Sequence, residues 1–199
     1  MHAPTIYAAV EGVTDEAVAT RLIRYVGAEP GPVYGRNGKL QLRSRIAGYN
    51  NAAKHSAWLV LVDLDRDEGC APPLCRQWLP DPAPRLCFRV AVRAAEAWLM
   101  ADTEGIAGFL GIARSRIPAD PDSLADPKQV LVNLARASRR RAVREDMVPR
   151  DGSGRAVGPA YPSRLIEFAS EIWEPEVASS RSDSLRRAIA CLVNLVAHS

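Results

Sequence analysis

Residues 58–68 have the sequence WLVLVDLDRDE, in which five consecutive apolar residues are followed by acidic residues at alternate positions. A short apolar run between polar residues is typical of a strand buried on both faces, as in a parallel sheet covered by helices. Ligands of such sheets bind at the carboxyl ends of the strands. The stretch therefore predicts a buried strand over residues 58–62 and a polar site that begins at Asp63.

Residues 6–10 form a second apolar run, IYAAV, which ends at Glu11. Because the carboxyl ends of parallel strands lie at one edge of a sheet, we expect Glu11 to lie near Asp63 and Asp65. Carboxylates held together without a counter-charge repel one another and are costly to bury. The two runs therefore predict a divalent metal ion between these acidic residues.

Helical periodicity alternates with the apolar runs through the first half of the chain. We expect helices over residues 15–26, 40–54 and about 94–102, a turn over 29–32, a short strand at 33–34 and a third strand over 86–92. Thr14 is the predicted N-cap of the first helix. Strands and helices in alternation predict the α/β class, with a mostly parallel sheet flanked by helices.

The second half of the chain has no convincing strand pattern. It predicts helices over residues 106–110, 127–144, 163–172 and 182–196, with a loop rich in Gly and Pro over 149–162. We expect residues 1–105 to form an α/β core and residues 106–199 to form a helical C-terminal extension packed on it, within one structural domain.

The formal net charge is only +3, from 26 basic and 23 acidic residues, which permits a nucleic-acid partner without requiring one. No apolar stretch approaches the roughly 18 residues needed to cross a bilayer, and the N-terminus lacks the pattern of a signal peptide. The sequence therefore predicts a cytoplasmic protein without a membrane partner. The oligomeric state stays open.

The chain has four cysteines, at positions 70, 75, 87 and 191. A cytoplasmic setting keeps thiols reduced. A zinc site formed by Cys70, Cys75 and Cys87 with His55 is an alternative, but its spacing matches no common zinc motif. Cys87 and Cys191 lie in apolar runs, which favours small core residues.

Magnesium and manganese take hard oxygen ligands, commonly one or two carboxylates with water and substrate phosphate. Glu11, Asp63 and Asp65 provide such a set, since alternation along an extended chain sends Asp63 and Asp65 to the same side. Asp67 continues the alternation as a ligand of the same ion or of a second one. The alternative is that these residues only cap helices and solvate strand ends.

Glu96 is a candidate ligand for a second metal ion, and Arg89 and Arg93 lead towards it as candidate phosphate-binding residues. The alternative is that Trp98 and its apolar neighbours pack the core while Asp102 caps the next helix. Both interpretations remain open.

The motifs after the first two strands resemble those of a known fold family. EGVTDE at residues 11–16 and DLDRD at 63–67 are similar to the TOPRIM domain of topoisomerases, primases and OLD-family nucleases. Together with EAWLMAD at 96–102 and SDSLRR at 182–187, they more closely resemble the TOPRIM-like DUF4276 family. This resemblance covers nearly the whole chain and implies a Rossmann-like TOPRIM fold. It also implies Mg²⁺ or Mn²⁺ bound by Glu11, Asp63 and Asp65, with Glu11 also a possible acid or base.

Two basic regions are candidate nucleic-acid surfaces. Arg43 and Arg45 lie on the helix predicted over residues 40–54, and Arg139, Arg140 and Arg141 form a denser run. The alternative is that these charges only solvate helix faces.

These residues favour a metal-dependent phosphodiester hydrolase that cuts DNA or RNA, with Arg66, Arg89 or Arg93 offsetting developing charge. The family resemblance implies an ATPase partner of the AAA or ABC type and a role in phage defence. The alternatives are a non-catalytic TOPRIM-like regulatory subunit that binds metal and nucleic acid, and a nucleotidyl transferase of the primase kind.

Overall fold

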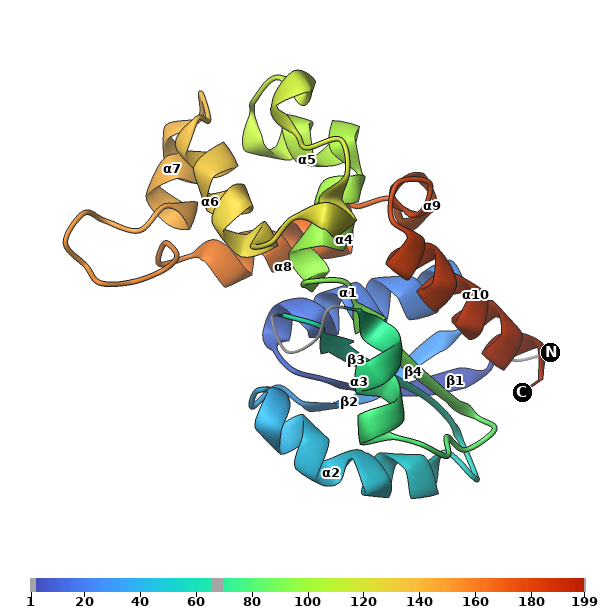
Figure 1. The fold of residues 1–199 in the computed structure, drawn as a ribbon. Helices are drawn as coiled ribbons and strands as arrows, with labels where there is room; N and C mark the ends of the chain where they lie inside the picture. The colour runs from blue at the N-terminus through green and yellow to red at the C-terminus, as the bar shows by residue number, and fades with distance from the viewer. Residues whose placement is uncertain (1–2, 66–69, 199) are drawn as a thin grey trace.

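The computed structural model describes residues 3–65 and 70–198, and within these ranges four strands form one parallel sheet (Figure 1). The strands are β1 (Thr5–Val10), β2 (Glu29–Gly35), β3 (Ala57–Asp63) and β4 (Leu86–Ala91), in the spatial order β2-β1-β3-β4. The sheet is flanked by helices, and a helical region follows it. The predicted α/β class with a Rossmann-like parallel sheet is therefore confirmed.

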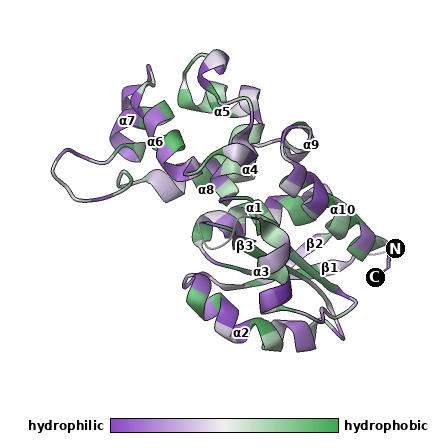
Figure 2. Cartoon of the chain, in the orientation of Figure 1, coloured by the Kyte–Doolittle hydropathy of each residue, from purple (hydrophilic) through white to green (hydrophobic). Residues whose placement is uncertain are grey.

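Helices cover both faces of the sheet. Side chains of β3 alternate between two hydrophobic clusters, with Leu59 and Leu61 in one and Val60 and Val62 in the other. The first cluster contains α1 (Val13–Tyr25) and α10 (Asp183–Ala197), and the second contains α2 (Lys39–Ala52) and α3 (Ala71–Trp78). Figure 2 shows the central strands as hydrophobic and α2 as mixed. Burial on both faces explains why β3 is continuously apolar.

The remaining helices form a layer beyond α1. They are α4 (Ala95–Ala101), α5 (Thr103–Leu110), α6 (Pro127–Arg136), α7 (Arg141–Met147), α8 (Tyr161–Glu171) and α9 (Pro175–Ser179), with single 3₁₀ turns at Arg114–Arg116 and Pro121–Ser123. The predicted division at residue 105 falls inside α5, and one hydrophobic cluster extends across it. Trp98 links the two parts, because its indole Nε1 donates to Ser184 Oγ at 2.7 Å and its carbonyl accepts from Trp173 Nε1 at 3.2 Å.

The turn predicted over residues 29–32 is wrong, because Glu29–Gly35 is one strand. Pro30 and Pro32 are tolerated since, among the described residues, β2 pairs only with β1 and is an edge strand. The register between Ile6 and Ala8 shifts by one residue against β2, so the Pro-Gly-Pro stretch lies at a bulge.

Two helix predictions are also wrong. The first helix begins at Val13 with Gly12 as its N-cap instead of Thr14. The single helix predicted over residues 127–144 is divided into α6 and α7 at Ser138, whose Oγ bonds to the Leu110 carbonyl and accepts from the Arg140 N–H at 3.0 Å. Across the described residues, no helix has the length and apolarity required to span a membrane.

Gly35→Ala should destabilise the protein more than Gly38→Ala. Both glycines have a positive φ, +90° at Gly35 and +86° at Gly38, so each alanine costs about 1–3 kcal/mol. At Gly35 an added Cβ would also lie 2.2 Å from the Val10 carbonyl oxygen, whereas nothing lies within 4 Å at Gly38. We expect this clash to add about 1–3 kcal/mol, measured by urea unfolding. Equal losses in the two variants would contradict the described end of β2.

Candidate functional site

Glu11 and Asp63 meet at the carboxyl edge of the sheet. β1 and β3 are parallel neighbours, and the residues that end them are joined by a hydrogen bond from the Asp63 backbone N–H to Glu11 Oε1 at 2.8 Å. The parallel pairing explains this contact between residues that are far apart in the sequence. The two residues therefore lie together at this edge, through the Glu11 carboxylate and the Asp63 backbone, and an ion shared by the carboxylates of Glu11, Asp63 and Asp65 stays a prediction.

Asp63 is held in place by the start of α4. Its Oδ1 accepts from the Ala95 backbone N–H at 3.0 Å. Burial raises the pKa of the Asp63 carboxyl well above its usual range, and the negative charges of Asp15, Glu96, Glu11 and Asp65 raise it further. Asp63 therefore lies where a positive charge would stabilise its ionised form.

Asp15 also belongs to this acidic cluster, although its sequence position indicated only a helix start. It does cap α1, because its Oδ2 accepts from the Gly12 backbone N–H at 2.8 Å. Only 8% of the residue is exposed, and burial together with Glu96 and Glu11 raises its pKa to about 7. The Gly12 N–H and Lys128 act in the opposite direction.

Glu96 completes the acidic cluster from the first turn of α4. It is 5% exposed, accepts from the Tyr161 hydroxyl at 3.4 Å and lies 3.7 Å from Lys128 Nζ. Glu96 is also the main cause of the raised pKa of the Lys128 ammonium. The alternative interpretation of this segment is confirmed, since Trp98 is buried and Asp102 Oδ1 accepts from the Gly105 N–H at 2.9 Å and caps α5, whereas a metal ion at Glu96 stays a prediction.

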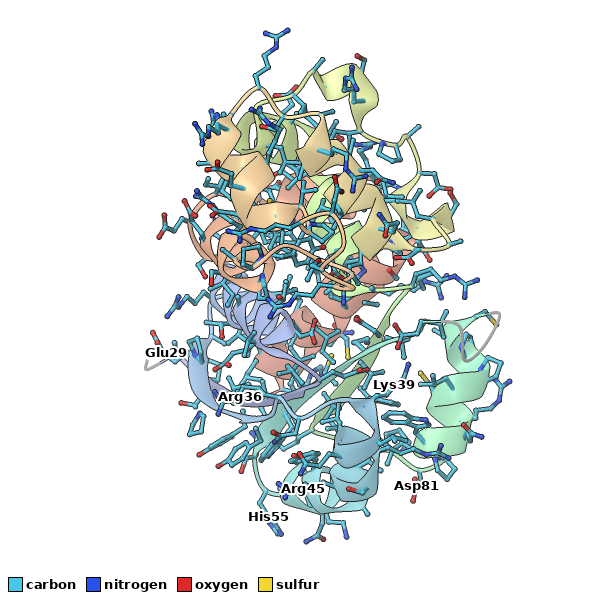
Figure 3. The ribbon with its side chains drawn as sticks, turned by 90° about the vertical axis from the view of Figure 1, so that its left-hand side faces the viewer. Glu29, Arg36, Lys39, Arg45, His55 and Asp81 are labelled. Atoms are coloured by element: carbon cyan, nitrogen blue, oxygen red, sulfur yellow. The ribbon has the colours of Figure 1, made fainter. Side chains whose placement is uncertain are left out.

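Asp65 is oriented differently from Asp63. β3 ends at Asp63, and Asp65 has a left-handed backbone with φ of +53°, so strand alternation does not extend to it. Its Oδ2 accepts from Lys39 Nζ at 2.9 Å, and the same ammonium contacts the carbonyl oxygens of Asp63 and of Leu64, the latter at 3.3 Å. Figure 3 shows Lys39, the first residue of α2, apart from Arg45 and His55. The predicted sites at Arg66 and Asp67 lie outside the described residues.

A cavity of about 320 Å³ adjoins the acidic cluster. It is lined by Asp65, Arg93, Asp126 and Lys128, among others. Arg93 is oriented by a left-handed backbone, with φ of +56°, and its Nη1 donates to the Asp65 carbonyl at 2.9 Å. Two cationic side chains in a cavity beside acidic residues form an arrangement suited to a phosphate group.

The oxygen donors of Glu11, Asp15, Asp63 and Glu96 suit Mg²⁺ or Mn²⁺, and the raised pKa values of Asp15 and Asp63 mark a place where a cation would stabilise the protein. These side chains do not, however, already surround one point as metal ligands would. Among the described residues, no three His, Cys, Asp or Glu side chains are arranged as a metal-binding group. Metal binding would therefore require local side-chain rotation. For the same reason, Cys70, Cys75, Cys87 and His55, which are all described residues, do not form a zinc-binding group.

The predicted nucleic-acid residues do not share one surface. Arg93 lies at the acidic cluster, whereas Arg89 lines a separate cavity with Cys87 and Cys191. Arg45 is exposed on α2, and the Arg43 guanidinium lies over the Trp78 ring at 5.7 Å.

Arg139, Arg140 and Arg141 come after the C-terminal end of α6, whereas Lys128 lies in its first turn, about 12 Å away along the helix. Arg140 Nη1 donates to the Phe109 carbonyl at 3.1 Å, and Arg141 pairs with Glu145 at 2.7 Å. Two of these three arginines therefore have structural partners within the helical layer.

Sequence reasoning missed the contribution of Lys128 and Tyr161 to the cluster. Each lies in the first turn of a helix, α6 or α8, and no local motif marks either one. Comparison with protein-family models, curated proteins and solved structures finds no match to this chain. The resemblance to the TOPRIM-like family therefore stays a prediction based on its motifs.

Asp15→Asn should remove a pH-dependent loss of stability in metal-free protein. The folded carboxyl has a pKa raised from 3.8 to about 7, so it holds its proton more tightly than the unfolded one. Wild type should therefore lose stability relative to Asp15→Asn as the pH rises from about 4 to 7, by on the order of 3–4 kcal/mol. Urea unfolding at pH 4.5 and 8 with a chelator measures this difference. Parallel pH dependence in the two proteins would contradict the described burial.

Proposed function

We propose that the protein is a cytoplasmic Mg²⁺- or Mn²⁺-dependent phosphodiester hydrolase, a nuclease of TOPRIM type acting on DNA or RNA. The observation that supports this function is the buried acidic cluster beside a cavity lined by Lys128 and Arg93. Nucleases combine these two features, since carboxylates hold a metal ion and basic side chains hold a phosphate.

Glu11 and Asp63 would hold the cation, with Asp15, Asp65 or Glu96 as further ligands. A bound Mg²⁺ or Mn²⁺ supplies Lewis-acid activation of the phosphate and lowers the pKa of water. The Asp63 N–H bond to Glu11 and the Ala95 N–H bond to Asp63 orient both carboxylates before any ligand arrives. Lys128 and Arg93 would contact phosphate oxygens and offset the charge that develops on them.

The wider setting is also a proposal. The sequence has no nucleotide-binding motif of its own, so an ATPase partner of the AAA or ABC type would supply nucleotide-driven action, in the context of phage defence that the family resemblance implies. Exposed Arg45 and Arg139 offer sequence-independent contacts to the nucleic-acid backbone.

A specific observation favours a second candidate, a non-catalytic TOPRIM-like regulatory subunit that binds metal and nucleic acid. The Lys39 ammonium contacts Asp65 Oδ2 and two backbone carbonyl oxygens, and so it already supplies a positive charge at this edge. A permanent ammonium there would favour binding of a phosphate over turnover.

Asp63→Asn tests the nuclease proposal. We expect it to reduce Mg²⁺- or Mn²⁺-dependent cleavage of labelled DNA or RNA by at least about 100-fold, since even outer partners of a metal site change activity by about 10–100-fold. It should also reduce the rise in Tm that the metal produces by mass action. Asp81→Asn is the matched control, because Asp81 is exposed and precedes β4 at the amino edge (Figure 3).

Three outcomes separate the candidates. Cleavage that survives Asp63→Asn in contaminant-free protein would overturn the mechanism. A metal-dependent rise in Tm without cleavage, alone or with an ATPase partner, would favour the regulatory subunit. No effect of metal on Tm at millimolar concentration would leave the acidic cluster with a structural role only.

Lys128→Gln tests the phosphate cavity. The variant removes a cation that lies 3.7 Å from Glu96. We expect the catalytic efficiency to fall by about 10–100-fold, which is less than the loss expected on removing a fully buried hydrogen-bond donor. Arg136→Gln on the same helix is the control, since its Nη1 bonds to Asn133 Oδ1 at 2.9 Å instead. Equal effects of the two variants on cleavage kinetics would indicate a general charge effect.

A further inference from the structure

A second cavity, of about 460 Å³, lies between β4 and the C-terminal half of α10. Alternation along β4 directs Cys87 and Arg89 to the face that α10 covers. Helical spacing places Arg187 and Cys191 on the stripe of α10 that faces them, and His198 follows the end of this helix. The cavity therefore brings together two cysteines that are 104 positions apart in the sequence.

Both thiols line this cavity but differ in exposure. Each thiol also changes the pKa of the other. Cys87 is fully buried, whereas Cys191 is half-buried and lines the cavity. A small solute that enters the cavity therefore meets Cys191 first.

The surroundings favour a thiolate at Cys191 and a thiol at Cys87. Interaction with the Cys87 thiol lowers the pKa of Cys191 to about 6, against the effect of burial, and Arg89 lowers it further. Burial raises the pKa of Cys87 well above its usual range.

The charged groups around the pair are all basic. Arg85, Arg89, Arg187 and His198 line the cavity, and no acidic residue does so among the described part of the chain. Arg85 donates to the His55 carbonyl at 3.2 Å and Arg187 pairs with Asp183 at 2.6 Å. The Nε atoms of Arg85 and Arg89 are both buried without a hydrogen-bond partner. Arg89 lies on the same face of β4 as Cys87, so its guanidinium is placed to stabilise a thiolate.

We propose that Cys191 and Cys87 form a redox-active pair in which Cys191 reacts with a peroxide and Cys87 resolves the product to a disulfide. The Cys191 thiolate attacks one oxygen of hydrogen peroxide and the O–O bond breaks, which gives a sulfenic acid and, after protonation, water. The Cys87 sulfur then displaces the sulfenic hydroxyl and loses its proton, which forms the S–S bond and a second water. Two thiols are oxidised while one peroxide is reduced to two waters.

The disulfide would fasten α10 to the edge strand. In the first turn of α10, Ser184 Oγ accepts from Trp98 Nε1 at 2.7 Å and from the Val92 N–H at 3.5 Å, close to the carboxyl end of β4. Disulfides in cytoplasmic proteins are commonly transient and redox-sensing. A covalent link between β4 and α10 suits such a role and does not depend on the proposed nuclease activity.

Peptide mapping of the full chain after treatment with a small excess of hydrogen peroxide tests the proposal. We expect a non-reduced peptide that joins Cys87 to Cys191 and disappears with dithiothreitol. In Cys87→Ser, dimedone should label Cys191 as a trapped sulfenic acid, and in Cys191→Ser the linked peptide should be lost. Cys70→Ser with Cys75→Ser is the matched control and should keep the link.

The wild-type map is informative even where a variant fails to fold. A map in which Cys87 and Cys191 stay reduced while the exposed Cys70 is oxidised would overturn the proposal, as would over-oxidation of Cys191 without a disulfide. The alkylation rate of Cys191 by iodoacetamide gives a second measurement. It should level off above about pH 7, whereas that of free cysteine rises to about pH 8.5. The same pH profile for Cys191 and for free cysteine would contradict a thiolate at Cys191.

Discussion

Burial of acidic side chains at the carboxyl edge of β1 and β3 is the constraint on which the surrounding structure depends, because a desolvated carboxylate needs hydrogen bonds or a nearby cation. The elements around this edge supply those hydrogen bonds and a nearby cation. The Ala95 N–H at the start of α4 donates to Asp63, and the Gly12 N–H at the start of α1 donates to Asp15. From the helical layer, Lys128 and Tyr161 reach Glu96. The second half of the chain is therefore part of the site, and the two halves depend on each other.

The features that sequence reasoning predicted correctly are those with a local cause. Runs of five to seven mostly apolar residues located β1, β3 and β4, because burial on both faces favours apolar side chains in such strands, with Arg89 of β4 as the exception. The contact between Glu11 and Asp63 followed from parallel pairing alone. Only residues 33–34 of β2 were predicted as a strand, because Pro30 and Pro32 are turn signals. Among the described residues β2 has a neighbour on one side only, which makes these prolines acceptable there.

The features that could not be predicted depend on tertiary packing. Lys128 is an ordinary helical lysine until α6 packs against α4, and Asp15 is an ordinary helix cap until Glu96 comes near it. The left-handed backbone at Asp65 turns its carboxylate to Lys39, and strand periodicity cannot anticipate such a change. The cavity between β4 and α10 belongs to the same class, because Cys87 and Cys191 looked like separate core residues in the sequence.

The prolines of β2 also bear on how the molecule behaves in a crowded solution. An open strand at the margin of a sheet offers unpaired N–H and C=O groups to strands of other molecules, and this is a common route to aggregation. Pro30 and Pro32 lack the N–H group, and the bulge between them distorts the outer ladder. The edge of the sheet formed by β2 is therefore a poor template for β-pairing between molecules. The two prolines that hid this strand from sequence analysis also protect the folded protein from aggregating through the edge of β2.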